Sequence, residues 1–264
     1  MTEWDATGYS EVSSLQRWLA DQHLAMLELD GTERVLDIGC GDGRITAEIA
    51  RRLESGSVLG IDPSTHMIDF AKAHFAEPAY PNLAFALGDA TALPYRGEFD
   101  VVVSFNALHW VLDQRAALRG IRAALQPAGR AFLEFVPRGP RKPLEDVIED
   151  TCGSERWAAC FAGRTPPYVH LTPEEYRRLA TANGLRVERL SRELKTWDFG
   201  SRQGFVDWAK VTFVAWTKSI AEERRLAFID DVLDRYGRLD ESSERKDGSV
   251  FRFYQMAAVL RVAP

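Results

Sequence analysis

Short apolar runs alternate with segments of helical period through the first half of the chain. Between these runs, apolar side chains recur at helical spacing, as at Ile45, Ile49 and Leu53. Uninterrupted apolar runs are typical of strands buried on both faces of a parallel sheet. The pattern therefore predicts successive units of strand, helix and strand, with the strands at residues 35–38, 57–62, 83–90, 99–106 and 130–136.

The pattern changes after residue 136, where several prolines and glycines mark a loop. Thr172, Pro173 and Glu175 have the chemistry of a capping box, which predicts a helix start there. We also expect one or two helices within 1–30, an irregular helix over 144–161, helices over 205–216 and 221–236, and strands over 185–199 and 250–262. The two helices between the last strands are interpreted as an insertion.

Charge and composition limit the kinds of partner that the protein is expected to bind. The 264 residues include 33 Lys and Arg against 39 Asp and Glu, a net charge of −6, although 138–142 is locally basic. An acidic balance argues against nucleic acid as a partner, because that affinity depends on clustered Lys and Arg. We expect a monomer or homodimer that acts on a small molecule.

The cysteines and the N-terminal segment indicate in which cellular compartment to expect the protein. The 3 cysteines are odd in number and have no metal-ligand spacing, so we expect a reduced, cytoplasmic protein and no bound metal. The first residues have no signal-peptide pattern, and no later stretch is apolar enough to span a membrane. We therefore expect no stable membrane insertion.

Three glycines, Gly39, Gly41 and Gly43, follow the first predicted strand directly and precede a predicted helix. Glycine permits positive φ and close approach of a ligand, and amides at a helix start receive polar groups. Asp62 ends the next strand at the spacing where a carboxylate accepts ribose hydroxyls. Arg44 stands where a GxGxxG dinucleotide fingerprint needs glycine, so a nicotinamide enzyme is the weaker alternative.

Four segments in order carry a family resemblance: 35–43, 60–64, 88–90 and 100–106. Together they resemble the motif series of the class I S-adenosylmethionine-dependent methyltransferases, over residues 33–136. With the strand pattern, this predicts an α/β, Rossmann-like sheet of seven mostly parallel strands with an antiparallel last strand and a helical cap. The expected divisions are cap helices at 1–30, the cofactor-binding core at 31–136, and the last strands at 137–264 with an insertion near 200–240.

The resemblance implies residues for binding S-adenosyl-L-methionine. Asp37 and the three glycines would hold its methionine portion, Asp62 its ribose, and Asp89 with Ala90 its adenine. The implied set is completed by Cys40, Pro63, Met67, Phe105 and Asn106.

A methyl acceptor is expected beside His109 and Trp110, which follow the fourth strand where open α/β sheets hold ligands. His109 is a candidate general base, an orienting group or a packing residue. The arrangement of Tyr9, Gln16, His109 with Trp110, and the late segment ending at Trp208 is similar to a subgroup that includes trans-aconitate and juvenile hormone acid methyltransferase-like enzymes. That similarity implies O-methylation of a small carboxylic acid.

Aromatic residues of the predicted cap would form an apolar acceptor site, and Trp197 and Trp208 are candidate substrate contacts. Arginines 138, 141, 164 and 202 could pair with an acceptor carboxylate. Other hypotheses about the acceptor and the function remain open. These are a phenol, amine, carbon or lipid acyl acceptor, a macromolecular acceptor, and a cofactor-binding partner without catalysis.

Overall fold

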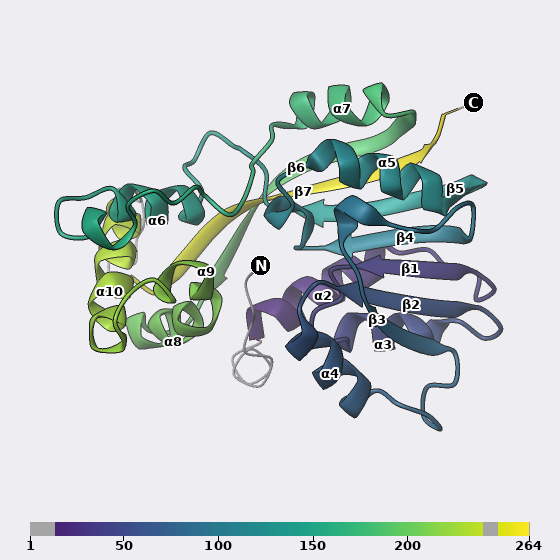
Figure 1. Cartoon of the computed structure of the whole chain (residues 1–264), viewed down its shortest axis with the longest axis horizontal. Helices are drawn as coiled ribbons and strands as arrows, with labels where there is room; N and C mark the ends of the chain where they lie inside the picture. Colours follow the sequence, from purple (N-terminus) through teal and green to yellow (C-terminus); the bar gives the residue numbers. More distant parts are fainter. Residues whose placement is uncertain (1–13, 240–247, 264) are drawn as a thin grey trace.

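One seven-stranded sheet runs through the protein, and helices cover both of its faces (Figure 1). The structure is a computed structural model, which describes residues 14–239 and 248–263. The strand order is β3-β2-β1-β4-β5-β7-β6, with β7 antiparallel to both of its neighbours and the pairs among β1 to β5 parallel. The strands are β1 Arg34–Ile38, β2 Ser57–Asp62, β3 Leu83–Leu87, β4 Phe99–Phe105, β5 Leu125–Phe135, β6 Leu185–Asp198 and β7 Val250–Val262.

This arrangement confirms the predicted fold, including the antiparallel last strand. The α-helices are α2 Ser14–Met26, α3 Arg44–Arg52, α4 Thr65–His74, α5 Gln114–Ala124, α6 Leu144–Cys152, α7 Pro173–Ala182, α8 Arg202–Thr212, α9 Val214–Thr217 and α10 Glu222–Arg238. Short 3-10 helices lie at η1 Ala90–Ala92, η2 Leu108–Trp110 and η3 Ala158–Cys160.

Side-chain caps begin several of these helices where the sequence places short polar residues. The Ser64 hydroxyl accepts the Met67 amide at 3.3 Å, and the Asp113 carboxylate accepts the Ala116 amide at 2.8 Å. Both halves of the capping box predicted at Thr172 and Glu175 are present. Each cap satisfies an amide that has no partner within its helix, so these polar residues fix where the helices begin.

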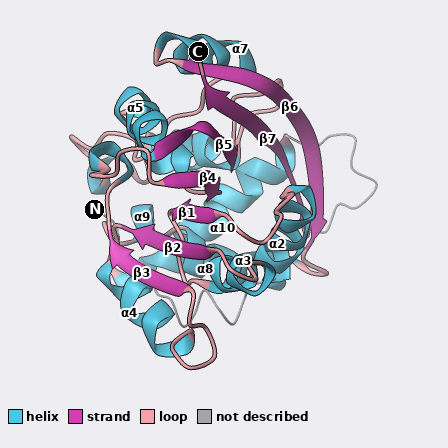
Figure 2. Ribbon diagram, turned by 90° about the vertical axis from the view of Figure 1, so that its right-hand side faces the viewer, coloured by secondary structure: helices cyan, strands magenta, loops and turns pink. Residues whose placement is uncertain are grey.

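Helices lie on both faces of the sheet (Figure 2), and alternate residues of the strands divide the core between these faces. Val35, Val101 and Val103 pack with α2 and α3 on one face, whereas Leu36 and Val102 pack with α5 and α7 on the other. Because both faces are buried, the strands read as continuous apolar runs, which is why their positions could be predicted.

A third hydrophobic cluster lies beyond the sheet, and we call its helices α6, η3, α8, α9 and α10 the cap. The cap is built on a two-stranded ribbon, residues 193–198 of β6 and 250–255 of β7, which extends past the end of β5. Figure 1 shows β6 and β7 reaching from the sheet into this helical part. Helices α8 to α10 are inserted between the ribbon strands, as predicted.

Three sequence expectations need correction in detail. The helix expected over 144–161 ends at Cys152, and a turn and η3 follow it. Strand β5 begins at Leu125, ahead of the start predicted at residue 130, because Leu125 pairs with Phe99 of β4 before a register shift leads to the pair of Val101 and Arg130. The helix expected over 205–216 is divided at Phe213 into α8 and α9.

Candidate active site

The turn after β1 carries its three glycines in the left-handed region. Their φ angles are 76° at Gly39, 54° at Gly41 and 81° at Gly43. A Cβ built on Gly39 would lie 2.2 Å from the Ala107 Cβ, whereas one on Gly41 would meet nothing within 4 Å. Glycine is therefore required at Gly39 by packing, and Gly41 leaves open space beside the backbone.

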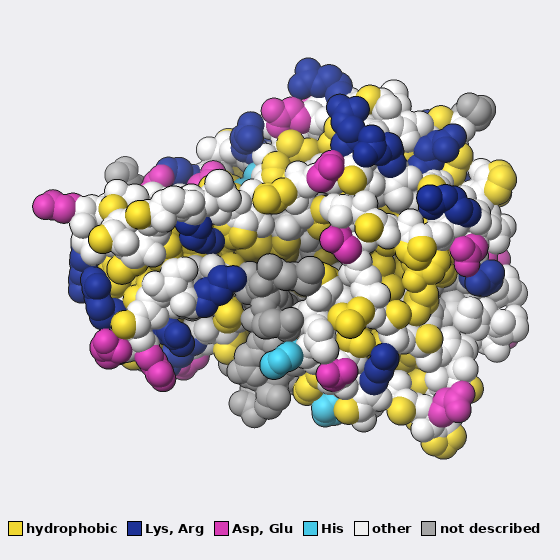
Figure 3. Space-filling model, viewed as in Figure 1, with side chains coloured by type: hydrophobic (Ala, Val, Ile, Leu, Met, Phe, Trp, Pro, Cys, Tyr) yellow, Lys and Arg dark blue, Asp and Glu magenta, His cyan; other side chains and the backbone are white. Residues whose placement is uncertain are grey.

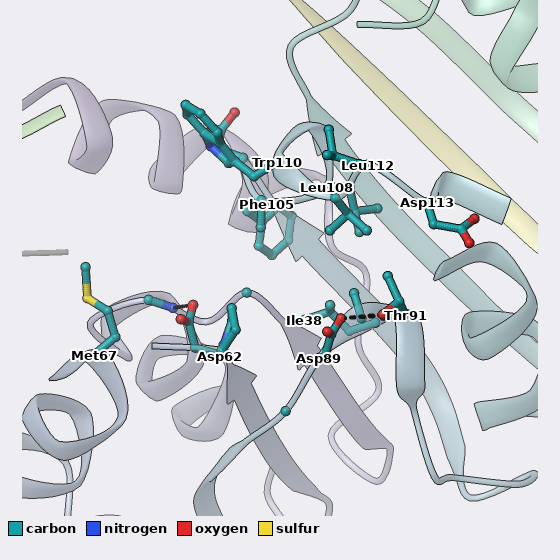
Figure 4. Close-up of a pocket in the computed structure, with 18 residues that line it drawn as sticks. Ile38, Asp62, Met67, Asp89, Thr91, Phe105, Leu108, Trp110, Leu112 and Asp113 are labelled. Carbon is teal, nitrogen blue, oxygen red and sulfur yellow. Dashed lines mark hydrogen bonds between the residues drawn. The ribbon is translucent and has the colours of Figure 1, made fainter. Parts of the chain in front are cut away.

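That space belongs to a cavity of about 420 Å³ at the carboxyl ends of the central strands, which we call the glycine-turn cavity (Figure 4). It combines the turn after β1, the ends of β2 and β3, and the segment from β4 through η2. Its lining residues are Ile38, Gly39, Gly41, Asp62, Pro63, Met67, Gly88, Asp89, Ala90, Thr91, Phe105, Asn106, Ala107, Leu108, Trp110, Val111, Leu112 and Asp113.

Asp62 fixes the floor of this cavity from the end of β2. Its carboxylate accepts the Gly41 amide at 3.1 Å through Oδ2 and the Ser64 amide at 2.9 Å through Oδ1. A carboxylate held in this way is oriented by backbone amides, and a carboxylate has about four positions at which it can accept hydrogen bonds. The structure thus ties Asp62 to the glycine turn, two features that are far apart in the sequence.

Asp89 follows the end of β3, on the same side of the cavity as Asp62, and is exposed (Figure 4). Its Oδ1 accepts both the amide and the hydroxyl of Thr91 at 2.8 Å, which caps the short helix η1. Two carboxylates that line one cavity from neighbouring strand ends suit a ligand with hydrogen-bond donors at separate positions.

Three of the residues implied for cofactor binding do not line the cavity. Asp37 is buried beneath the turn, where its Oδ2 accepts the Thr46 hydroxyl at 2.7 Å. Burial raises the pKa of Asp37 to about 7, and the nearby Asp62 carboxylate also raises it, while the Thr46 bond opposes the change. Cys40 packs with Phe85 in a small hydrophobic cluster, and a Cβ at Gly43 would meet Phe85 at 2.7 Å.

A second cavity, of about 130 Å³, lies on the cap side of the first and shares Asn106 and Trp110 with it. We call it the aromatic cavity, because indole and phenyl rings form much of its wall. Its lining residues are Leu15, Leu19, Asn106, His109, Trp110, Val136, Leu144, Glu145, Ile148, Trp208, Thr212, Phe213, Trp216, Phe251 and Phe253.

Asn106, at the junction of the two cavities, has a backbone conformation that is rare for residues other than glycine. Its φ is 56°, its amide donates to the Glu134 carbonyl at 2.7 Å, and its side-chain oxygen accepts from Gln255 at 3.0 Å. Left-handed backbone of this kind is strained and persists where surrounding contacts hold it, which is common at ligand sites.

His109 faces the aromatic cavity and is only 4% exposed. Burial lowers its pKa well below the usual value, and the neighbouring His170 lowers it further, so the ring is neutral near pH 7. Its Nδ1 has no hydrogen-bond partner in the described part of the chain, and neither does the Trp208 Nε1. Buried polar atoms without partners are costly, and ligand binding is one explanation for them.

Known proteins are similar to this chain over the segment that forms the glycine-turn cavity. Residues 35–129 match the family model described as a methyltransferase domain. The chain is 27% identical over 236 residues to the trans-aconitate 2-methyltransferase of Methylobacterium radiotolerans, covering 87% of each protein. It is 34% identical over 129 residues to the juvenile hormone acid O-methyltransferase of Bombyx mori, covering 47% of this chain and 45% of that one.

The matched segment contains all four motifs and the whole glycine-turn cavity. The methyltransferase domain and these relatives support a class I S-adenosylmethionine-dependent methyltransferase. The solved structure of the Haemonchus contortus phosphoethanolamine N-methyltransferase 2, in complex with S-adenosyl-L-methionine, has the same fold. Its TM-score is 0.62 at 17% identity, covering 97% of this methyltransferase and 56% of that chain.

The structure brings most predicted residues of this methyltransferase to its two cavities. Ten of those assigned to the cofactor or catalysis line the glycine-turn cavity, namely Gly39, Gly41, Asp62, Pro63, Met67, Asp89, Ala90, Phe105, Asn106 and Trp110. Trp208 lines the aromatic cavity. Trp197 lies on the ribbon, where its ring is 5.5 Å from that of Trp18, and it lines neither cavity. Tyr9 and the side chain of Gln16 lie outside the described residues.

The four arginines considered as partners for an acceptor do not line the aromatic cavity. Arg138 pairs with Glu175, Arg164 with Glu149, and Arg202 with Asp230 and Asp234. Arg141 lies over the Tyr236 ring. These guanidinium groups serve the packing and surface of the methyltransferase instead.

Two functional candidates on the cap side were missed in the sequence. His170 has no partner that the sequence alone reveals, but it is buried between Glu145 and Asp146, its Nε2 3.8 Å from Glu145 and its Nδ1 3.6 Å from Asp146. Glu145 lines the aromatic cavity from the first turn of α6. No sequence motif signals either residue, because only the folded chain brings α6 beside the loop at 168–170.

The remaining expectations concern nucleic acid, membranes and metal ions. In Figure 3, Lys and Arg side chains lie mainly toward the margins of the visible face and are interspersed with acidic ones. None of the described helices is both long and apolar enough to cross a membrane. The described residues contain no group of three or more His, Cys, Asp or Glu side chains placed to hold a metal ion.

Proposed function

We propose that this methyltransferase transfers the methyl group of S-adenosyl-L-methionine to an oxygen of a small carboxylic acid. The observation that carries the proposal is the aromatic cavity, which adjoins the glycine-turn cavity at Asn106 and Trp110. It contains two buried atoms without hydrogen-bond partners in the described chain, the His109 Nδ1 and the Trp208 Nε1. A carboxylate leaving water needs donors of this kind.

The residues of the glycine-turn cavity fit the cofactor. Asp62 would accept the ribose hydroxyls, Asp89 the adenine amino group, and the open space beside Gly41 admits a ligand against the backbone. When bound, S-adenosyl-L-methionine supplies a methyl group already activated by the positive sulfur. The protein then has to align an acceptor and exclude water.

The acceptor's charge decides what His109 does. A carboxylate already has a free lone pair, so its methylation requires no general base. His109 is neutral because burial and His170 lower its pKa, and a neutral imidazole can donate one hydrogen bond and accept another. We therefore assign His109 to orienting the acceptor beside Trp110, and not to removing a proton from it.

The relatives support an acid as acceptor. The two curated relatives described above are named for acids, trans-aconitate and juvenile hormone acid. The walls of the aromatic cavity further favour an acceptor with an apolar body, since aliphatic and aromatic side chains make up most of them. An amine or a phenol is the alternative acceptor, and the experiment has to distinguish it from an acid.

A screen with methyl-labelled cofactor tests the proposal. The purified protein is incubated with matched apolar acids, phenols and amines, and the labelled products are extracted and treated with mild base. We expect label in the acids, released by base because methyl esters hydrolyse. Stable label confined to phenols or amines would refute the acid assignment, and calorimetry without binding of S-adenosylhomocysteine would refute the cofactor assignment.

A further inference from the structure

Asn106 lies where the two cavities meet, and the fold holds both its backbone and its side chain. Its backbone amide donates to the Glu134 carbonyl at 2.7 Å, and its side-chain Oδ1 accepts the Gln255 Nε2 at 3.0 Å. These two contacts come from β5 and from β7. A residue with a φ of 56° needs such support, because the left-handed region is unfavourable for side chains other than glycine.

Gln255 is buried behind Asn106 and lines neither cavity. It is only 3% exposed, and its Oε1 has no hydrogen-bond partner in the described part of the chain. Within that part, the bond to Asn106 is the one hydrogen bond that its side-chain amide makes. Burying an amide is costly unless it is hydrogen-bonded, so packing alone would be served better by an apolar side chain. The amide therefore points to a role that depends on Asn106.

The direction of the bond between these two side chains decides what Asn106 presents to the cavities. Gln255 is the donor, so the Asn106 oxygen is turned toward β7. The nitrogen of a planar amide lies on the opposite side of the Cγ carbon and carries two N–H donors. Asn106 lines both cavities and Gln255 lines neither, so the donor end of the Asn106 amide is the end toward their junction.

We propose that Gln255 is a positioning residue, which directs the Asn106 N–H groups at a carboxylate bound where the two cavities meet. A carboxylate only accepts hydrogen bonds, so it needs donors at this junction. Two carboxylates are candidates, that of the acceptor and the α-carboxylate in the methionine portion of the cofactor. This inference rests on the proposed function, because both carboxylates belong to its ligands.

Replacing Gln255 by glutamate should reverse the polarity of Asn106. An ionised carboxylate accepts and cannot donate, so it would draw the Asn106 nitrogen toward β7 and turn the oxygen toward the junction. A bound carboxylate would then face an oxygen where it needs a donor, which weakens its binding. Replacement by methionine nearly keeps the volume but removes the bond, so the Asn106 amide would lose its preferred orientation.

The test compares Gln255→Glu and Gln255→Met with the original protein. Gln126→Glu is the control, because it makes the same change of charge at the amino end of β5 and outside both cavities. Calorimetry measures binding of S-adenosylhomocysteine and of 5′-methylthioadenosine, which lacks the α-carboxylate. It also measures binding of octanoic acid, an apolar acid with one carboxyl group, to protein saturated with S-adenosylhomocysteine.

At pH 8 we expect Gln255→Glu to bind the carboxylate at the junction roughly tenfold more weakly, Gln255→Met to lose less, and the control to lose nothing. A loss confined to octanoic acid would identify the acceptor's carboxylate. A loss for S-adenosylhomocysteine but not for 5′-methylthioadenosine would identify the cofactor's carboxylate. Unchanged binding in both variants would overturn the role of Gln255, and so would an equal loss for 5′-methylthioadenosine, which has no carboxylate to contact.

A pH series separates the direction of the bond from a merely structural effect. A protonated carboxyl group has an O–H donor, so Gln255→Glu should regain binding as the pH falls and its introduced side chain takes up a proton. Burial favours this protonation. Each variant is compared with the original protein at the same pH, and Gln255→Met should show no such recovery. A loss in Gln255→Glu that stays constant from pH 8 to about pH 5.5 would overturn the assigned direction.

Failure of the proposed function would look different. The original protein would bind S-adenosylhomocysteine and methylate octylamine but not octanoic acid. The comparison of S-adenosylhomocysteine with 5′-methylthioadenosine would still decide the role of Gln255 in that case. Thermal melts followed by circular dichroism identify any variant whose loss is due to unfolding. If Gln255→Glu did not fold, the binding measured for Gln255→Met would decide the outcome, since it introduces no charge.

Discussion

At the scale of single residues, two carboxyl groups in the core differ in what surrounds them. Asp62 accepts backbone amides at the edge of the glycine-turn cavity, whereas Asp37 accepts one hydroxyl in a fully buried position. Hydrogen bonds from amides favour the charged form, and burial disfavours it. The two residues should therefore respond differently to substitution.

Asp37→Asn should make the unliganded protein less sensitive to pH. The native pKa of Asp37, about 7, is above its ordinary value of 3.8, so the folded protein binds more protons between these values. The stabilising contribution of this carboxyl group is complete below about pH 4 and is lost as pH rises through 7. At pH 8 the variant should be more stable by as much as about 4 kcal/mol, since each pKa unit is worth about 1.4 kcal/mol.

Urea unfolding of the ligand-free protein between pH 5 and pH 8 measures this difference. Asp69→Asn, which removes an exposed carboxyl group on α4, provides the control. A stability difference between Asp37→Asn and the original protein that stays constant over this range would contradict the prediction.

Asp62→Asn and His109→Ala should separate cofactor binding from turnover. Asp62 lines the glycine-turn cavity and His109 lines only the aromatic cavity. Replacing one of the two acceptor oxygens of Asp62 by an amide donor should weaken cofactor binding by about 1 to 3 kcal/mol. His109→Ala should leave the calorimetric dissociation constant for S-adenosylhomocysteine nearly unchanged and lower kcat. Equal loss of cofactor binding in both variants would mean that His109 is wrongly assigned.

At the scale of elements, the turn between β1 and α3 does two things with neighbouring glycines. Gly39 lets the turn pass Ala107, the residue that follows Asn106 after β4, while Gly41 leaves room for a ligand. The turn therefore sets both the packing of two strand ends and the floor of the cavity.

Gly39→Ala and Gly41→Ala should have different consequences. Both place a side chain at positive φ, which costs about 1 to 2 kcal/mol, but only Gly39→Ala also puts a Cβ 2.2 Å from Ala107. We expect the larger loss of unfolding free energy for Gly39→Ala. Gly41→Ala should fold and bind S-adenosylhomocysteine poorly, because its methyl group enters the cavity. Denaturant unfolding and calorimetry measure the two effects, and equal losses of stability would contradict this account.

Elements whose character is set locally were the ones that could be predicted. Strands β1, β2 and β4 were found because burial on both faces makes them mostly apolar, and the helix at Thr172 because its cap is encoded in adjacent residues. The start of β5 was missed because Leu125 pairs with Phe99 of β4, while residues 126–129, which follow it, include Pro127 and Gly129 and have the composition of a turn. Glu145 and His170 were missed because their meeting depends on tertiary packing, which leaves no periodic signal.

At the scale of the whole molecule, the two cavities draw on different parts of the fold. The residues of the glycine-turn cavity come from the sheet and the loops at its strand ends. The aromatic cavity adds α2, α6, α8, α9 and the ribbon, through residues such as Leu15, Ile148 and Phe251. The cap is joined to the sheet by the ribbon, so contacts across the aromatic cavity supplement that connection.

Hydrogen exchange should reveal this division as two separate steps of protection. S-adenosylhomocysteine should slow exchange in the loops around 39–43, 88–91 and 105–113, because their residues line its expected site. Octanoic acid added afterwards should slow exchange in α6 and α8, whose side chains it would contact. Peptides of β5 provide the control, since this strand lies inside the sheet between β4 and β7. Full protection of α6 and α8 by S-adenosylhomocysteine alone would contradict the prediction. It would mean that the cap responds to the cofactor without an acceptor, so that the two cavities do not bind their ligands as separate sites.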